Sequence, residues 1–277
     1  MVLNLIEGFG ILALAGFLVG FISGLVGIGG GMLFVPIFWI VFPILGIKET
    51  LIVKSSVATS AACMTVTSFT SAYHHIKAKY FNKKIFKNLL VGAIPGVIIG
   101  ASLTSLFLPP KIVKVFFAIF LAIMAYKTFK GKSKGKAEAE ESSYNVSFKN
   151  IVIIGFFAGL LAGMLGVGGG ALITPMLHNF CHVPIKEAMA TNTGVVFLNS
   201  LTSSLSYIIF GIKNTHLPYF LGYIYLPALF IMVPFLIMGT KLGVKLMHNT
   251  HPDKLRKIFA VILFLVALNV IYKTIFK

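Results

Sequence analysis

Four apolar stretches of the chain are long enough to cross a lipid bilayer as helices. They cover residues 88–108, 112–129, 218–240 and 256–276, and each approaches or exceeds the ~20 apolar residues that a spanning helix needs. Their apolar residues do not alternate with polar ones as in the strands of a membrane barrel. Because hydrocarbon tolerates only helices and closed barrels, these stretches predict an all-α integral membrane protein.

The composition agrees with this fold class and argues against others. Hydrophobic residues make up 57% of the chain, charged residues 11%, and the mean hydropathy is +0.95. The net charge of +17 comes mostly from lysines in short segments between apolar stretches, which indicates cytoplasmic loops rather than nucleic-acid binding. The first residues lack the basic region and cleavage site of a signal peptide, so we expect them to belong to the mature fold.

A glycine-rich motif occurs twice inside apolar segments. Residues 23–36 read SGLVGIGGGMLFVP and residues 162–175 read AGMLGVGGGALITP, so four glycines and one proline recur in the same order. Each motif is followed by the tripeptide IKE, then by a helix rich in Ser, Thr or Asn, and then by two longer apolar helices. This duplication predicts two homologous halves.

The two halves are separated by a segment of different composition. Residues 130–148 are mostly charged or small and lack periodicity, which is typical of a solvated linker. We therefore divide the chain into a first membrane repeat at 1–129, a cytoplasmic linker at 130–148 and a second membrane repeat at 149–277.

The basic residues indicate how the halves are oriented. If each glycine-bearing segment returns to the side from which it enters, seventeen of the 24 Lys and Arg residues lie on the side of the linker. A single crossing by each segment gives only fourteen. The positive-inside rule favours the first arrangement. We therefore expect an inverted repeat of about 8–10 transmembrane or half-spanning helices in the plasma membrane, with the linker in the cytoplasm and both termini outside.

The glycine clusters are candidates for an anion site. The helices that follow them, about 32–44 and 171–181, are ~20 Å or less in length and too short to span comfortably. Broken backbone near the midplane requires surrounding protein or water, so we expect the two turns to lie close together. Glycine leaves amides bare, and each short helix directs its positive end at the turn. The candidate residues are Gly27, Gly29, Gly30, Gly31, Gly166, Gly168, Gly169 and Gly170.

Close helix packing is the alternative use of glycine in a membrane. We assign that role to the glycines spaced by four before each cluster, namely Gly16, Gly20, Gly24, Gly155, Gly159 and Gly163. Both interpretations remain open for the clusters themselves, although their duplication and the short helices favour the binding site.

The polar helix of each half supplies further candidates. One face carries Ser56, Ser60, Cys63, Thr67 and Thr70 in the first half, and Asn192, Asn199, Ser203 and Ser206 in the second. These side chains either line a pathway and donate hydrogen bonds to an oxyanion, or join neighbouring helices. We select Ser56, Ser60, Asn192 and Asn199 as substrate-binding residues, and the two asparagines are the costlier ones to bury.

Ionisable residues are absent from the interior of the apolar stretches. No Asp or Glu lies there, which disfavours coupling to protons through a membrane carboxylate. Lys54, near the start of the first polar helix, either attracts anions at an outer vestibule or extends toward the membrane surface. His178, Cys181 and His182 have a spacing that suits metal ligands but lack a carboxylate partner, so we predict neither a metal nor a cofactor.

The doubled motif GxxxGxxGxGGGxxxxP resembles the signature of the sulfite exporter TauE/SafE family, also called the toluene-sulfonate uptake permease family. The resemblance covers the chain apart from residues 130–147 and implies a plasma-membrane transporter of sulfite or related organosulfur anions. The motif residues that it carries over are Gly27, Gly29, Gly30, Gly31, Pro36, Gly166, Gly168, Gly169, Gly170 and Pro175.

We therefore expect a transporter, and not an enzyme, that exports a small sulfur oxyanion through a central site formed by the two GxGGG helix ends. With the cell interior negative, an anion that leaves gains ~2.3 kcal/mol per charge per 100 mV, so export needs no coupling ion. The alternatives are an anion channel with the same site, an uptake permease, or a membrane enzyme that uses the thiol of Cys63. The expected partners are a small anionic substrate and the lipid bilayer, without nucleic acid.

Overall fold

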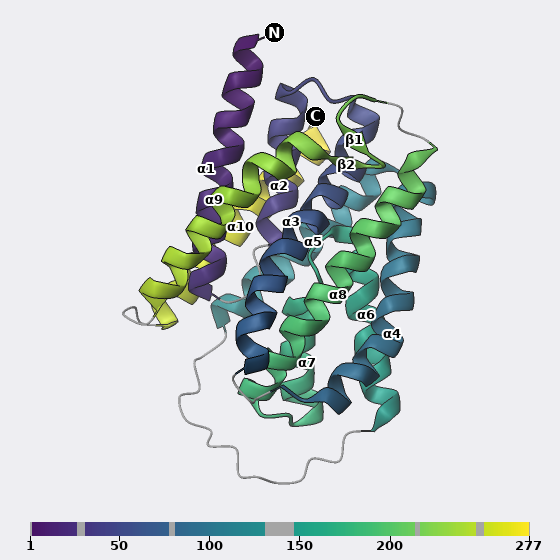
Figure 1. Cartoon of the computed structure of the whole chain (residues 1–277), viewed down its shortest axis with the longest axis vertical. Helices are drawn as coiled ribbons and strands as arrows, with labels where there is room; N and C mark the ends of the chain where they lie inside the picture. The colour runs from purple at the N-terminus through teal and green to yellow at the C-terminus, as the bar shows by residue number, and fades with distance from the viewer. Residues whose placement is uncertain are drawn as a thin grey trace.

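The computed structural model describes residues 2–26, 31–77, 81–130, 147–213, 217–247 and 252–276 (Figure 1). Within these ranges the chain forms ten α-helices, one π-helical turn and one two-stranded hairpin. The first half contains α1 (Val2–Val26), α2 (Gly31–Ile44), α3 (Glu49–Lys77), α4 (Lys83–Ser102), the π-helical turn η1 (Leu103–Phe107) and α5 (Pro110–Lys130). The second half contains α6 (Phe148–Leu165), α7 (Gly170–Cys181), α8 (Ile185–Ile212), β1 (Phe220–Leu221), β2 (Ile224–Tyr225), α9 (Leu226–Met247) and α10 (Pro252–Phe276).

Six of the described helices are long and apolar enough to cross a membrane. They are Glu49–Phe69, Lys83–Phe107, Pro110–Lys130, Phe148–Leu165, Glu187–Ile212 and Leu226–Gly243. Large apolar side chains such as Phe116, Ile119 and Ile123 of α5 are exposed on the outside of the bundle, where lipid takes the place of water. The prediction of a helical multi-pass membrane protein with about 8–10 helices is confirmed.

Single residues account for several helix ends. Asn82 caps α4, because its Oδ1 accepts hydrogen bonds from the backbone N–H groups of Lys84 and Ile85, both at 2.9 Å. Pro110 opens α5 at a position where no intrahelical N–H donor is needed. Gly166 ends α6 in the left-handed conformation, with a φ angle of 67°.

The two short helices begin at the last glycine of each cluster. Helix α2 has 14 residues and α7 has 12, which is well below the length of a spanning helix. Protein covers one side of α2, where Phe34, Phe38 and Phe42 are completely buried. The helix bounds predicted from the sequence, 32–44 and 171–181, agree with the observed bounds to within one residue.

One of the apolar stretches differs from the prediction. Residues 218–240 are not a single helix, because a hairpin of β1 and β2 precedes α9, which begins only at Leu226. Gly222 makes the turn of this hairpin with a φ angle of 57°, and Pro227 then occupies the first turn of the helix. Hydropathy alone does not separate this aromatic hairpin from the apolar helix that follows it.

Glycine stripes allow α4 and α6 to pack backbone against backbone. The glycines in direct contact with the opposite backbone are Gly92, Gly96 and Gly100 of α4 and Gly155, Gly159 and Gly163 of α6. A Cβ atom at any of these positions would overlap the partner helix. Gly92 lies against Val152 and Gly100 against Leu160, so the two helices run parallel.

Helices α1 and α9 form the corresponding pair. Gly16 lies against the backbone of Met232 and Gly20 against that of Leu236, so these helices also run parallel. The packing role predicted for the glycines spaced by four is therefore confirmed for five of the six, and the surroundings of Gly24 are not described.

The polar helices α3 and α8 cross in opposite directions. The hydroxyl of Thr65 contacts that of Ser204, and the hydroxyl of Ser68 contacts that of Ser200. Because of this crossing and the two parallel pairs, α1 begins and α2 ends at one end of the molecule, whereas α6 begins and α7 ends at the other (Figure 1). α1 begins and α10 ends on the same side of the molecule, toward the top of the view.

Candidate functional site

The second glycine cluster forms a buried turn between α6 and α7. Gly166, Gly168 and Gly169 have φ angles of 67°, 69° and 76°, in the left-handed region that favours glycine. All residues from 166 to 170 are buried inside the protein. The chain thus interrupts its helix at the position that the sequence indicates, and it does so where protein surrounds the backbone.

Several backbone N–H groups of this turn make no hydrogen bond to another described residue. The N–H of Gly166 donates to the carbonyl of Ala162 at 2.9 Å, and that of Leu172 donates to Gly169 at 3.1 Å. No hydrogen bond among the described residues engages the amides of residues 167–171. Helix α7 directs the positive end of its dipole at the same amides. Such a row of buried donors is chemically suited to a negatively charged ligand.

Three of the four polar residues predicted for the site contact this turn. Ser60 Oγ of α3 donates to the carbonyl of Gly166 at 2.8 Å. Asn199 Nδ2 of α8 donates to the carbonyl of Gly168 at 3.3 Å, and Asn192 Nδ2 donates to that of Gly170 at 2.9 Å. The fourth residue, Ser56, is completely buried one helical turn from Ser60, and its hydroxyl has no hydrogen-bond partner.

Two further hydroxyl groups hold the end of α6 and were not selected from the sequence. Tyr207 donates to the carbonyl of Gly163 at 2.9 Å, and Thr104 of η1 donates to that of Met164 at 3.1 Å. Together with Ser60, they satisfy carbonyls that the end of a helix leaves free. The spacing of four residues from Asn199 through Ser203 to Tyr207 is the signal that would have found the tyrosine.

The start of α2 lies beside this turn. Gly27, Gly29 and Gly30 are outside the described residues, but Gly31 begins α2. A Cβ atom on Gly31 would overlap the sulfur of Met64 and lie 3.1 Å from the Cα of Val167. A Cβ atom on Gly168 would meet the same methionine at 2.6 Å. The side chain of Met64 therefore fills the space between Gly31 and Gly168.

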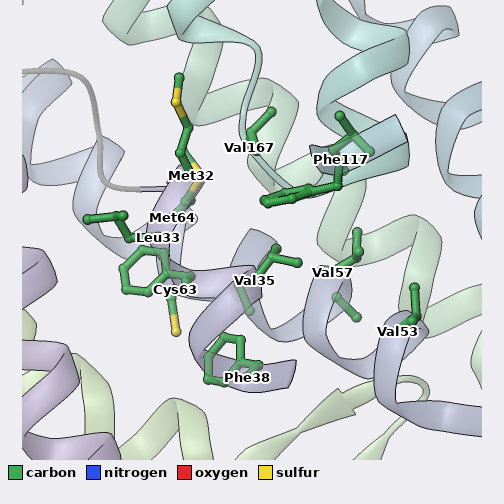
Figure 2. Close-up of a cluster of buried hydrophobic side chains, with 14 of the residues drawn as sticks. Met32, Leu33, Val35, Phe38, Val53, Val57, Cys63, Met64, Phe117 and Val167 are labelled. Carbon is green, nitrogen blue, oxygen red and sulfur yellow. The ribbon is translucent and has the colours of Figure 1, made fainter. Parts of the chain in front are cut away.

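Met64 belongs to a buried cluster of apolar side chains (Figure 2). The labelled cluster comprises Met32, Leu33, Val35 and Phe38 of α2, Val53, Val57, Cys63 and Met64 of α3, Phe117 of α5, and Val167 of the turn. Cys63 is completely buried within this cluster, so no route from the protein surface leads directly to its thiol.

The ionisable candidates Lys54 and His178 contact backbone carbonyl groups. Lys54 Nζ donates to the carbonyl of Ser105 at 2.6 Å and lies 5.5 Å from the ring centre of Tyr223. His178 Nδ1 lies 3.0 Å from the carbonyl oxygen of Val183. Among the residues that the structure describes, no group of three His, Cys, Asp or Glu side chains is arranged to hold a metal ion.

Fold and site together define a multi-pass helical membrane protein with a buried, uncharged, amide-rich turn. The sequence model of the Sulfite exporter TauE/SafE family matches residues 12–270. The chain therefore belongs to this family, and it is a membrane transporter.

Two relatives that match most of the chain, and one that matches part of it, carry transporter or exporter names. A "Probable membrane transporter protein" of Methanocaldococcus jannaschii is 32% identical over 255 residues, which cover 91% of each chain. The "Probable membrane transporter protein YunE" of Bacillus subtilis is 28% identical over 283 residues, covering 97% of this chain and 99% of the relative. The "Sulfite exporter TauE/SafE family protein 6" of Arabidopsis thaliana is 28% identical over 103 residues, or 36% of this chain and 24% of the relative.

Proposed function

We propose that the protein exports a small sulfur oxyanion, either sulfite or a related organosulfonate, through a site formed by the N-terminal ends of α2 and α7. The observation that carries this proposal is the row of amides at residues 167–171, which have no acceptor among the residues that the structure describes. No Asp, Glu, Lys or Arg occurs between residues 150 and 185, so the backbone itself supplies the attraction. The polar residues of the site are Ser56, Ser60, Asn192 and Asn199.

The two halves, residues 1–129 and 149–277, form an inverted repeat around this site. The exchange of partners supports this arrangement, because α4 of the first half packs along α6 of the second while α9 of the second packs along α1 of the first. A two-fold axis between oppositely oriented copies produces such reciprocal contacts. Alternating access then follows when one repeat rocks against the other.

The lysines support an orientation in the plasma membrane. The linker at 130–148 is cytoplasmic and both ends of the chain are outside, because this arrangement puts most basic residues inside. An anion that leaves the cell then moves down the membrane potential, and export needs no coupling ion. The closed packing of Met64 between Gly31 and Gly168 favours a carrier over an open anion channel. An uptake permease would in addition require a coupling ion.

Flux measurements in proteoliposomes at a defined voltage test the proposal. Sulfite, sulfate, thiosulfate and methanesulfonate are offered to the full-length protein, and we expect saturable flux of at least one sulfur oxyanion. Gly169→Leu places a side chain at a left-handed position against the backbone of Ala158, and we expect it to abolish transport, as we do for Gly30→Leu. Flux that does not saturate would favour the channel.

Two further variants separate loss of the site from loss of the fold. Gly170→Ala keeps a helical conformation and puts one methyl group against Val196 and Asn192, so we expect a folded protein without transport. Gly10→Leu is the matched control, because no atom lies within 4 Å of a Cβ at that position. Wild-type flux in Gly170→Ala would mean that the turn is not part of the transport pathway.

A further inference from the structure

Two asparagines beside the second glycine turn carry amide oxygens without hydrogen-bond partners. Asn199 is completely buried, and its Nδ2 group donates to the carbonyl of Gly168 at 3.3 Å. Asn192 Nδ2 donates to the carbonyl of Gly170 at 2.9 Å and to Thr174 Oγ1 at 2.8 Å. The Oδ1 atoms of both asparagines are buried and unpartnered.

The partners of the two amides fix their orientation. A backbone carbonyl only accepts hydrogen bonds, so the nitrogen of each asparagine has to face the glycine carbonyl that it contacts. The oxygen of each amide then points away from that carbonyl, and it can only accept. Because buried polar atoms normally have partners, two such acceptors at one turn indicate that a donor is missing.

The same turn therefore offers a ligand both donors and acceptors. The donors without an acceptor among the described residues are the amides of residues 167–171, and the free acceptors are Oδ1 of Asn192 and of Asn199. A sulfonate or a fully deprotonated oxyanion presents only acceptor oxygens, so it satisfies the amides but leaves the asparagine oxygens unpaired. An oxyanion that retains one O–H group satisfies the amides and, in addition, one of the two asparagine oxygens.

The charge of the site favours the same type of ligand. The chain carries no Asp, Glu, Lys or Arg between residues 150 and 185. The neighbours of the turn from α3 and α8 are either apolar, such as Val57, Met64 and Val196, or uncharged, as are Ser60, Asn192 and Asn199. The cost of transferring an ion into a poorly polarisable interior rises with the square of its charge. A neutral site therefore accepts a singly charged anion far more readily than a doubly charged one.

We propose that this turn selects a singly charged oxyanion that carries one O–H group, and that hydrogen sulfite is the sulfur species that fits. The selection rests on the proposed function and refines it. The amides of residues 167–171 hold the deprotonated oxygens, and Oδ1 of Asn192 or Asn199 accepts the O–H group. Organosulfonates, which have the same charge but no O–H group, are poor substrates.

Methanesulfonate and sulfite at different pH provide the test in proteoliposomes that contain the full-length protein. Raising the pH at constant total sulfite converts hydrogen sulfite into the dianion, and we expect the flux to follow the remaining hydrogen sulfite. Methanesulfonate should move at least about tenfold more slowly than hydrogen sulfite at equal concentration, since it leaves a buried acceptor unpaired. Protein-free liposomes at each pH give the passive leak to be subtracted.

Alanine variants test whether the two asparagines are responsible for the selection of the O–H group. We expect Asn192→Ala and Asn199→Ala to lower the flux ratio of hydrogen sulfite to methanesulfonate by up to about tenfold, because the acceptor is gone. The ratio does not depend on how much folded protein each preparation contains. Thr193→Ala is the control and should keep the wild-type ratio, since the Thr193 hydroxyl bonds only to the carbonyl of Met189 in its own helix.

The outcomes distinguish this inference from the function on which it rests. Equal rates for hydrogen sulfite, the sulfite dianion and methanesulfonate would overturn selection by an O–H group and leave sulfur oxyanion transport standing. Rates that do not exceed the protein-free leak for any anion would overturn the proposed function and the inference with it. An unchanged flux ratio in both asparagine variants would overturn the role assigned to the asparagines.

Discussion

The loop before α4 and the hairpin before α9 hold corresponding positions in the two halves, at opposite ends of the molecule. The loop makes polar contacts, whereas the hairpin packs through aromatic side chains. At one end, the loop before α4 donates the N–H of Asn82 to Thr191 Oγ1 of α8 at 3.1 Å. At the other end, the hairpin before α9 donates the N–H of Tyr225 to Thr59 Oγ1 of α3 at 3.1 Å. Each half thus places a backbone donor on a threonine in the polar helix of the other half.

The surroundings of the two contacts differ in polarity and burial. Asn82 belongs to a polar, partly exposed group in which its Nδ2 donates to Glu187 Oε1 at 2.5 Å. Tyr225 belongs to a buried aromatic group, where its ring centre lies 5.7 Å from that of Phe42 and 5.0 Å from that of Phe220. Water can replace a lost partner at the first contact but not at the second. We infer that the contact at the hairpin end contributes more to the free energy of unfolding than the contact at the polar end.

The largest effect is expected at the centre of the hairpin. Tyr223 is 1% exposed and packs against Tyr207, with ring centres 6.4 Å apart. Tyr223→Ala removes a buried aromatic ring, so the free energy of unfolding should fall by about 3–5 kcal/mol. The melting temperature of the purified protein in detergent reports the loss. Tyr219→Ala is the control in the same hairpin, because Tyr219 is 71% exposed, and an equal loss there would mean that the hairpin is not anchored through its buried face.

Matched threonine variants compare the two ends directly. Thr59→Val leaves the buried N–H of Tyr225 without an acceptor, which should cost about 1–3 kcal/mol. Thr191→Val removes the acceptor of a partly buried N–H, and we expect a smaller loss of about 0.5–1.5 kcal/mol. Both substitutions keep the shape of the side chain, so the difference in melting temperature isolates the hydroxyl. A larger loss in Thr191→Val would reverse the comparison.

The comparison also separates what local sequence encodes from what it does not. The short helices α2 and α7 were predictable, because glycine clusters interrupt a helix wherever they occur. The hairpin was not predictable, since Tyr223 and Tyr225 read as part of one apolar stretch, and only their contacts with α3 and α8 explain why they leave the helix.

The same limit applies to the candidate site. Asn192 and Asn199 could be selected from the sequence, because amides are costly in an apolar helix. Their expected role as donors to an oxyanion stays a prediction, and the structure shows in addition that their Nδ2 groups donate to the carbonyls of Gly170 and Gly168. Which atom of an amide faces a ligand depends on partners that lie 22 and 31 residues away in the chain. Pattern and spacing contain no information about such contacts.

The smallest effect is expected at the polar end. Asn82→Ala removes both the cap of α4 and the hydrogen bond to Glu187, and we expect a loss of about 1 kcal/mol. Asn82→Ser separates the two contributions, because serine also caps a helix but is too short to reach the carboxylate. If the cap dominates, the melting temperature of the serine variant returns close to that of the wild type. A serine variant as unstable as the alanine variant would mean that the contact with Glu187 contributes more stability than the cap. The polar end would then be stabilised mainly by its contact with α8, as the hairpin end is stabilised by its contact with α3.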